Sequence, residues 1–263
     1  NNNNNNIYCL NKITEETFEL ENLNQIECIN DNEVDVIYIN EIFQESDYLE
    51  KNLSETSLIR SDIACIIYTS GTQGNPKGVM LSHGGILNNC EGSKELLGEI
   101  INHKPKFLTW LPLSHSYEHT VQFVQIAVGA TVYYAESIDK LVKNMNDCSP
   151  DIMTAVPRFY QNLYQKINAS FNKTNGLKKY LINKMLSLGE KAFFKNKLSN
   201  LEKVQNIICE KLVRKKIKAQ FGGSLKAFVS GGGALDYQVG IFLNSIGLPT
   251  LQGYGLTETS PVV

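Results

Sequence analysis

A glycine- and hydroxyl-rich segment with one lysine carries the strongest chemical signal in this sequence. It runs Tyr68-Thr69-Ser70-Gly71-Thr72-Gln73-Gly74-Asn75-Pro76-Lys77-Gly78 and follows an apolar run at residues 63–67. Glycine lets backbone amides approach an anion, hydroxyls add donors, and lysine brings a mobile positive charge. A buried strand followed by such a loop predicts a polyphosphate site, although not the common P-loop, which ends in Gly-Lys-Ser/Thr. An ordinary glycine-rich surface loop is the alternative.

Two later segments offer complementary chemistry. Gly231, Gly232 and Gly233 would let a flat base approach the backbone, and Ala234 follows them. In residues 252–258, Tyr254 could stack on a base and Thr257 could donate to a phosphate. Glu258 is a hard oxygen ligand suited to Mg²⁺, or else a carboxylate favoured at a helix N-terminus. Ligands of open α/β sheets sit at the carboxyl ends of strands, so we expect the three loops to meet there.

Strand-like and helix-like segments alternate along the chain. Apolar runs predict strands at residues 34–39, 63–67, 107–111, 129–134, 152–156, 225–229 and 249–252. Helices are expected at residues 86–101, 117–128 and 235–246, and residues 158–220 read as largely helical with a break at 173–176. This alternation predicts an α/β fold with a mostly parallel sheet flanked by helices on both faces.

Two further motifs allow other interpretations. His115-Ser116-Tyr117-Glu118-His119 matches the H-x-x-E-H zinc motif, but Pro112 lies just before it and a third ligand is not evident. A pocket-lining or structural role is favoured over zinc. Residues 201–218 form a basic amphipathic helix that could lie on a membrane surface. A solvated helix whose apolar face packs against the sheet is the favoured interpretation.

Composition narrows the classes of partner. The chain has 263 residues, 42% hydrophobic and 20% charged, with a net charge of -2, which favours a globular protein and gives no reason to expect nucleic-acid binding. The six cysteines are scattered without a C-x-x-C pair, as expected for reduced thiols. With no apolar run long enough to span a bilayer and no secretory signal, we expect a cytoplasmic protein, with peripheral membrane contact left open.

Four ordered motifs resemble those of adenylate-forming (AMP-binding) enzymes. They are residues 68–78, Leu111-Pro112-Leu113-Ser114-His115, residues 229–236 and residues 252–258. Within that superfamily the chain looks most like long-chain fatty-acid–CoA ligases, because of residues 113–118, 154–158 and 251–263. The resemblance covers residues 62–263 and implies that the chain is part of the large N-terminal domain of such a synthetase.

The resemblance implies a two-step reaction with ATP, Mg²⁺, a fatty acid and CoA. The fatty-acid carboxylate attacks the α-phosphorus of ATP and releases pyrophosphate; the CoA thiol then displaces AMP. By motif position the β- and γ-phosphates would be held by Thr69, Ser70, Gly71, Thr72, Gly74 and Lys77. Adenine would be flanked by Gly231, Gly232, Ala234, Gln252, Gly253 and Tyr254. Thr257 would contact the α-phosphate, Glu258 with Thr69 would bind Mg²⁺, and His115 and Lys77 would act on the reacting groups.

The sequence departs from the family at its ends. It starts with six asparagines and stops after the last motif, so both ends look cut from something longer. The family's ribose-binding aspartate and its C-terminal domain, with the adenylation lysine, are missing. We expect a disordered tract at 1–6, a remnant of a preceding subdomain at 7–60 and a truncated nucleotide-binding subdomain at 61–263.

Several interpretations of this truncation stay open. The chain alone is expected to turn over little or not at all, and a separate chain could supply the C-terminal domain. A degenerate, non-catalytic nucleotide-binding fragment and an enzyme that activates other acids are the alternatives.

Overall fold

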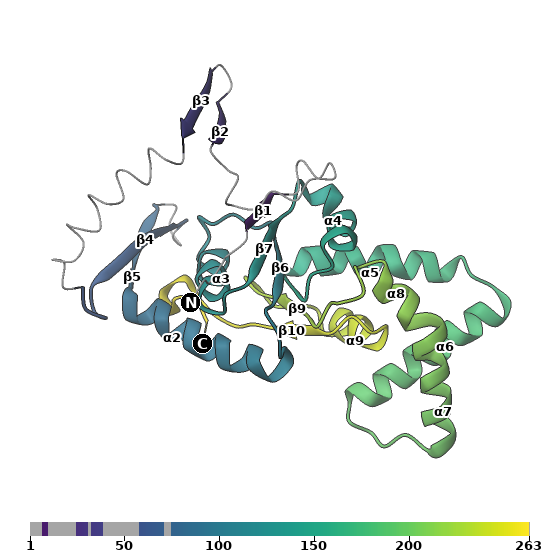
Figure 1. Cartoon of the computed structure of the whole chain (residues 1–263). Helices are drawn as coiled ribbons and strands as arrows, with labels where there is room; N and C mark the ends of the chain where they lie inside the picture. Colours follow the sequence, from purple (N-terminus) through teal and green to yellow (C-terminus); the bar gives the residue numbers. More distant parts are fainter. Residues whose placement is uncertain (1–6, 10–24, 31–32, 39–57, 71–74, 263) are drawn as a thin grey trace.

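The computed structural model describes residues 7–9, 25–30, 33–38, 58–70 and 75–262, with the backbone alone for the first three ranges. The expected disordered tract at 1–6 lies outside the described residues, as do Gly71, Thr72 and Gly74 of the first loop. Figure 1 shows a central sheet with helices on both sides, and a long helical extension from one flank.

The central sheet is parallel throughout, as the sequence predicts. Its order is β1-β7-β6-β8-β9-β10, and every neighbouring pair is parallel. The strands are β1 (Ile7–Cys9), β7 (Thr131–Tyr134), β6 (Lys106–Thr109), β8 (Ile152–Ala155), β9 (Ala227–Ser230) and β10 (Thr250–Gln252). Parallel strands end at one edge, so the segments that follow β6, β8, β9 and β10 gather at that edge.

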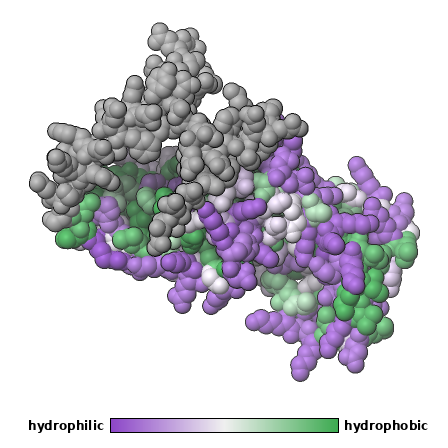
Figure 2. Space-filling model, viewed as in Figure 1, coloured by the Kyte–Doolittle hydropathy of each residue, from purple (hydrophilic) through white to green (hydrophobic). Residues whose placement is uncertain are grey.

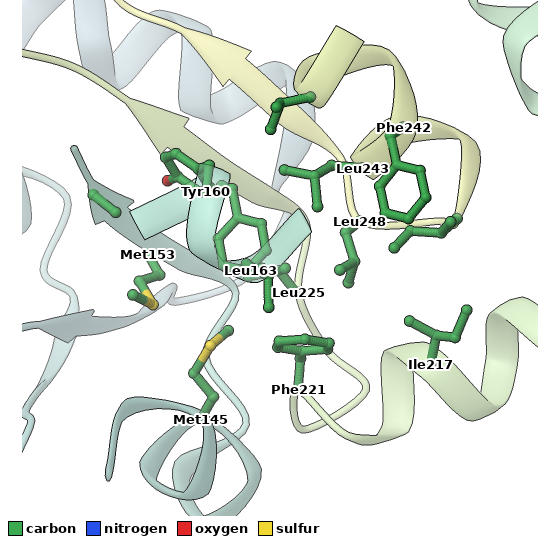
Figure 3. Close-up of a cluster of buried hydrophobic side chains, with 14 of the residues drawn as sticks. Met145, Met153, Tyr160, Leu163, Ile217, Phe221, Leu225, Phe242, Leu243 and Leu248 are labelled. Atoms are coloured by element: carbon green, nitrogen blue, oxygen red, sulfur yellow. The ribbon is translucent and has the colours of Figure 1, made fainter. Parts of the chain in front are cut away.

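Both faces of this sheet are buried. Phe107 of β6 packs with Ile101 and Val132 on one face, whereas its neighbour Leu108 joins Met145 and Met153 on the other. Successive side chains of a strand point to opposite faces, so a strand buried on both sides reads as a continuous apolar run. Figure 3 shows the larger cluster, in which helical side chains such as Tyr160 and Phe242 pack against the sheet.

The helices expected at 86–101, 117–128 and 235–246 are present, and a further one between β7 and β8 is not predicted from the sequence. The helices are α2 (His83–Ile100), α3 (Ser116–Ala127), η3 (Ile138–Lys140), α4 (Leu141–Cys148), α5 (Pro157–Asn172), α6 (Gly176–Phe193), α7 (Asn200–Cys209), η4 (Glu210–Arg214), α8 (Lys215–Ala219), α9 (Tyr237–Ser245) and η5 (Thr257–Thr259). A further antiparallel pair, β2 (Gln25–Asn30) with β3 (Glu33–Tyr38), contains the strand expected at 34–39. No helix in the described part of the chain is long and apolar enough to cross a membrane.

The first glycine-rich segment is not a βα loop of the main sheet, and that prediction is wrong. It joins β4 (Ile63–Thr69) to β5 (Lys77–Ser82), which pair with each other antiparallel as a separate two-stranded sheet. Ile63 and Ile66 are 54% and 53% exposed, so the run taken for a buried strand is largely at the surface. Short apolar runs do not reveal which sheet they join or how deeply they lie, and this one joins a hairpin.

The predicted helical region at 158–220 is confirmed, with an additional interruption. α5 ends at the expected break, and a second break falls between α6 and α7. There Ser199 and Glu202 form a capping box: Ser199 Oγ accepts from the Glu202 amide, and Glu202 Oε2 accepts from the Ser199 amide. Such reciprocal bonds satisfy amides that a helix start leaves free.

Five of the seven apolar residues expected to pack against the sheet do not do so. In α7 and η4, Leu201, Val204, Ile207, Ile208 and Leu212 are all exposed. Polar contacts determine how these elements lie, because the buried Arg214 donates from Nε to the Ser245 carbonyl at 2.7 Å. The predicted orientation is therefore wrong for these five residues, while Cys209 of α7 and Ile217 of α8 are buried in the larger core cluster and Val213 of η4 packs against it.

Candidate active site

A cavity of about 210 Å³ lies at the carboxyl edge of the main sheet. It forms where the N-terminal end of α3 meets the segments that follow β9 and β10. Its walls are His115, Ser116, Tyr117, Gly231, Gly232, Gly253, Tyr254, Gly255, Leu256, Thr257, Pro261 and Val262. Residues more than a hundred positions apart thus share one site, at the edge where α/β proteins bind ligands.

One wall is a tyrosine ring pressed against a glycine. Tyr117 is 8% exposed, and its hydroxyl donates to the Val229 carbonyl at 3.0 Å. A Cβ on Gly231 would lie 2.6 Å from Cζ of that ring, closer than atoms tolerate. Glycine at 231 is therefore required by this packing, and this buried residue also borders the cavity.

Gln252 joins the loops that follow β9 and β10 through hydrogen bonds. Its Oε1 accepts from the Leu235 amide at 2.9 Å, and its Nε2 donates to the Gly233 carbonyl at 3.1 Å. The Gly253 amide also donates to the Ser230 carbonyl at 2.7 Å. Gln252 thereby fixes the shape of the glycine-rich loop, although it does not line the cavity itself.

The segment after β10 folds back on itself and bonds to α3. A Cβ on Gly255 would lie 1.7 Å from the Pro261 carbonyl oxygen, so only glycine fits this turn. Ser116 Oγ lies 3.2 Å from Thr257 Oγ1, and Thr120 Oγ1 donates to the Ser260 carbonyl at 3.0 Å. These bonds keep Thr257 at the cavity wall.

His115 caps α3 at the rim of the cavity. Its Nδ1 accepts from the Tyr117 amide at 3.2 Å, which places the proton of the neutral ring on Nε2. The ring is exposed, so Nε2–H can donate to a ligand oxygen.

A buried carboxyl lies directly behind the cavity. Glu118 is 0% exposed and accepts from Thr109 Oγ1 and Thr154 Oγ1, each at 2.9 Å. Burial raises the pKa of Glu118 to about 7, because desolvation of the carboxylate outweighs the two hydrogen bonds that lower it. Thr109 in turn accepts from Gln125 Nε2 at 2.9 Å, so the network ties α3 to β6 and β8.

The side chains of the H-x-x-E-H motif point in different directions and do not form a zinc site. Glu118 faces the sheet, and His115 caps the helix. His119 Nε2 lies 3.6 Å from Cys65 Sγ, toward β4. Within the residues that the structure describes, no group of three or more His, Cys, Asp or Glu could hold a metal ion.

The structure brings together six of the residues expected at the site: His115, Gly231, Gly232, Gly253, Tyr254 and Thr257. Ala234 and Glu258 are exposed outside the cavity walls. Ser70 and Lys77 are exposed and Thr69 half-buried on the separate hairpin, where Thr69 Oγ1 donates to the Lys77 carbonyl at 3.4 Å. Gly71, Thr72 and Gly74 lie outside the described residues.

Six further residues of the cavity wall are not predicted from the sequence: Ser116, Tyr117, Gly255, Leu256, Pro261 and Val262. Ser116 and Tyr117 directly follow His115 at the start of a helix after a strand, which is a usable signal for a residue at the carboxyl edge.

The donor set at this edge fits a nucleotide with a divalent cation. The aromatic face of Tyr254, which is 68% exposed, can stack on a base, and the Thr257 hydroxyl suits a phosphate. Glu258 is exposed next to Thr257, and its carboxylate is a hard ligand of the kind that Mg²⁺ takes. At about 210 Å³ the cavity is below the ~300–1,000 Å³ typical of small-molecule sites, so it has room for only part of such a ligand.

A parallel α/β fold with a ligand cavity at the carboxyl edge of its sheet defines the class of protein. The chain belongs to the AMP-binding enzyme family, whose pattern it matches over residues 10–263. It is 33% identical over 210 residues to long chain acyl-CoA synthetase 3 of Arabidopsis thaliana, which covers 76% of this chain and 30% of that protein. The chain thus spans about a third or less of the length of the curated relatives it matches.

Two solved structures have the same fold. One is O-succinylbenzoate coenzyme A synthetase of Bacillus subtilis in complex with ATP and magnesium ion, with a TM-score of 0.51 and 21% identity. It covers 78% of this chain and 33% of that chain. The other is the adenylation domain of a carboxylate reductase from Mycobacterium chelonae, with a TM-score of 0.54 and 21% identity over 74% of this chain and 27% of that chain.

Proposed function

We propose that this chain is the nucleotide-binding part of a long-chain fatty-acid–CoA ligase. A fatty-acid carboxylate oxygen attacks the α-phosphorus of ATP, and the bond to pyrophosphate breaks. The thiol of CoA then attacks the acyl carbonyl carbon and AMP leaves, giving the thioester. The long-chain substrate is proposed from the relatives, which include acyl-CoA synthetases at 31–33% identity.

The observation that carries this proposal is the cavity in which His115, Gly231, Tyr254 and Thr257 meet. Adenine would lie beside Gly231 and the exposed Gly232, with Tyr254 on its face. The Thr257 hydroxyl would donate to the α-phosphate. Charge that develops on phosphate oxygens is stabilised most by donors already fixed in place, and Thr257 is fixed by Ser116.

The remaining roles lie around this cavity. His115 Nε2–H would donate to the fatty-acid carboxylate and hold it in line with the α-phosphorus. Lys77 and the hydroxyls of Thr69 and Ser70 would bind the β- and γ-phosphates from the β4–β5 hairpin. Glu258 would hold Mg²⁺, whose positive charge would offset that of the phosphates.

The direct test is fatty-acid-dependent exchange of labelled pyrophosphate into ATP by the full-length protein. Exchange that needs palmitate and Mg²⁺, with AMP rather than ADP as the product, is expected. Glu258→Gln should raise the Mg²⁺ concentration that gives half-maximal exchange. Glu190→Gln, which removes an exposed carboxylate from α6, is the matched control and should leave that concentration unchanged.

Two other outcomes would replace the proposal. Nucleotide binding without exchange for any acid would indicate a non-catalytic binding protein. Exchange with short or aromatic acids, and none with long-chain acids, would keep the adenylate chemistry and remove the long-chain assignment. The same assay on residues 1–263 alone tests whether this part needs the rest of the protein for turnover.

A further inference from the structure

Five aliphatic side chains on α7 and η4 face solvent on one side of the helix. They are Leu201 (68% exposed), Val204 (55%), Ile207 (55%), Ile208 (42%) and Leu212 (50%), and we refer to them as the α7 apolar stripe. Their spacing of three and four residues places them along one helical face. In Figure 2 an apolar surface bordered by hydrophilic atoms lies over the region that α6 and α7 occupy in Figure 1.

The polar face of α7 is turned toward the protein instead. Glu202 accepts from Lys191 Nζ of α6 at 2.8 Å, and Asn206 Oδ1 accepts from Arg214 Nη1 at 2.8 Å. Arg214 Nη2 also donates to the Met185 carbonyl at 3.2 Å. A surface helix of a globular protein ordinarily buries its apolar stripe, so α7 departs from that pattern by exposing its aliphatic residues.

Lysines surround the stripe without carboxylate partners. Glu202 pairs with Lys191, and Glu210 pairs with Lys218 at 2.7 Å and Arg214 at 3.6 Å. Five lysines of this region form no ion pair within the described residues: Lys197, Lys203, Lys211, Lys215 and Lys216. The surface is therefore both apolar and positively charged.

The stripe continues into an apolar groove. Leu212 and Lys216 also line a cavity of about 830 Å³ between α5, α6 and the η4–α8 segment. Its walls include Leu177 of α6, which is 73% exposed, and Ile167 of α5. The charged residues among these walls are Lys166, Lys178 and Lys216, and no carboxylate lines the groove.

From this combination we infer that α7 and η4 dock on the surface of an anionic lipid bilayer. The α7 apolar stripe enters the boundary between headgroups and acyl chains, and the lysines reach lipid phosphates with their aliphatic stems along the apolar surface. Contiguous apolar surface rimmed by polar residues marks an interaction site. An anionic bilayer offers an apolar layer for the aliphatic side chains and negative charge for the lysines.

Charge argues against a second copy of the chain as the occupant. A two-fold interface would bring the same lysines of both copies together, with Glu202 and Glu210 already paired within each copy. The other occupant to test is the remainder of the protein, because the curated relatives are longer than this chain. Docking on lipid requires no nucleotide. The docking can therefore fail its test while the proposed reaction passes, and the reaction can fail while the docking passes.

The experiment is cosedimentation of the full-length protein with vesicles of phosphatidylcholine, alone or mixed with phosphatidylserine. We expect binding to the mixed vesicles, weakened by added salt. Ile207→Ser with Ile208→Ser should lower the partition coefficient at least about tenfold, while the fold is unaffected because both side chains are exposed. Ile138→Ser, at a residue 68% exposed on η3, is the matched control and should bind as the unaltered protein does.

A second pair of variants tests the role of charge, with one lysine near the α7 apolar stripe and one far from it in the sequence. Lys211→Glu should weaken binding to mixed vesicles about fivefold or more, since each lysine near an anionic surface contributes about 1 kcal/mol. Lys94→Glu on α2 should change binding little. Fatty-acid-dependent exchange measured without vesicles should be the same for all four variants.

Three results would overturn the inference. One is equal binding to vesicles with and without phosphatidylserine. Another is strong hydrogen-exchange protection of α7 in the full-length protein before vesicles are added, which would assign the stripe to the rest of the chain. The third is a dimer that Ile207→Ser with Ile208→Ser dissociates, which would assign it to a second copy.

Discussion

The two sets of glycine-rich loops differ in how the protein holds them. The segments after β9 and β10 are fixed by Gln252, by the ring of Tyr117 and by the Ser116–Thr257 contact. The β4–β5 hairpin pairs in its own ladder and packs through Ala64 and Cys65 against α2 and α3, whereas Ser70 and Lys77 at its end are exposed. Similar composition thus occurs in two settings: the cavity loops are part of the packed fold, whereas the end of the hairpin is exposed.

The largest effect is expected for Gly231→Val. The new side chain would overlap the buried Tyr117 ring, whose hydroxyl is bonded to Val229, so we expect the free energy of unfolding to fall by about 3 kcal/mol or more. Nucleotide binding should be lost as well. Denaturant unfolding and titration with AMP measure the two effects.

Gly233→Val is the matched control for this prediction. A Cβ at Gly233 would lie 3.6 Å from Pro157 Cγ, an ordinary contact, so stability should change far less. Equal stability of the two variants would mean that the Tyr117 ring is free to move, and would remove the basis for calling this wall rigid.

The next largest effect concerns the buried Glu118 and pH. Its pKa is raised to about 7 in the folded protein from 4.5, so the folded state binds the proton more tightly than the unfolded state. This group therefore makes stability fall as pH rises from about 4.5 to about 7, by at most about 3 kcal/mol, with no further change above that. Urea unfolding at pH 5 and pH 8 measures the difference.

Glu118→Gln isolates this contribution, because the amide does not titrate. The difference between pH 5 and pH 8 should shrink by about 3 kcal/mol or less relative to the unaltered protein. Glu95→Gln on α2, where the side chain is exposed, should leave the pH dependence as it was. An unchanged slope in Glu118→Gln would show that this carboxyl titrates alike in both states.

The main sheet and half of the residues that line the cavity can be predicted from the sequence, for a physical reason. Runs such as residues 107–111 are apolar on both faces, which a buried parallel strand requires, and the chemistry of Tyr254 and Thr257 is local to the segment after β10. The hairpin could not be recognised because residues 63–67 are equally apolar but exposed in part. The orientation of α7 was missed because the polar contacts of Arg214 with Ser245 and Met185 join residues far apart in the sequence.

Lys77→Ala separates function from stability in the hairpin. Lys77 is exposed, so its removal should change the free energy of unfolding by no more than about 0.5 kcal/mol. If the ammonium binds ATP phosphates, the affinity for ATP should fall about tenfold or more, as expected for a charged hydrogen bond. Titration with ATP·Mg²⁺ measures this, and Lys94→Ala controls for the loss of a surface charge. Loss of stability without loss of affinity would instead make Lys77 a structural residue.

The smallest effect distinguishes two serines of the same chemical type. Ser116 is 2% exposed and its Oγ lies 3.2 Å from Thr257 Oγ1, so Ser116→Ala should cost about 1 kcal/mol of stability. Ser70 is exposed on the hairpin, and Ser70→Ala should cost less than half of that. Both should weaken ATP binding, Ser116→Ala by releasing Thr257 and Ser70→Ala by removing a phosphate donor. Because only the first also changes stability, unfolding and titration on the same two variants separate a hydroxyl that builds the site from one that only touches its ligand.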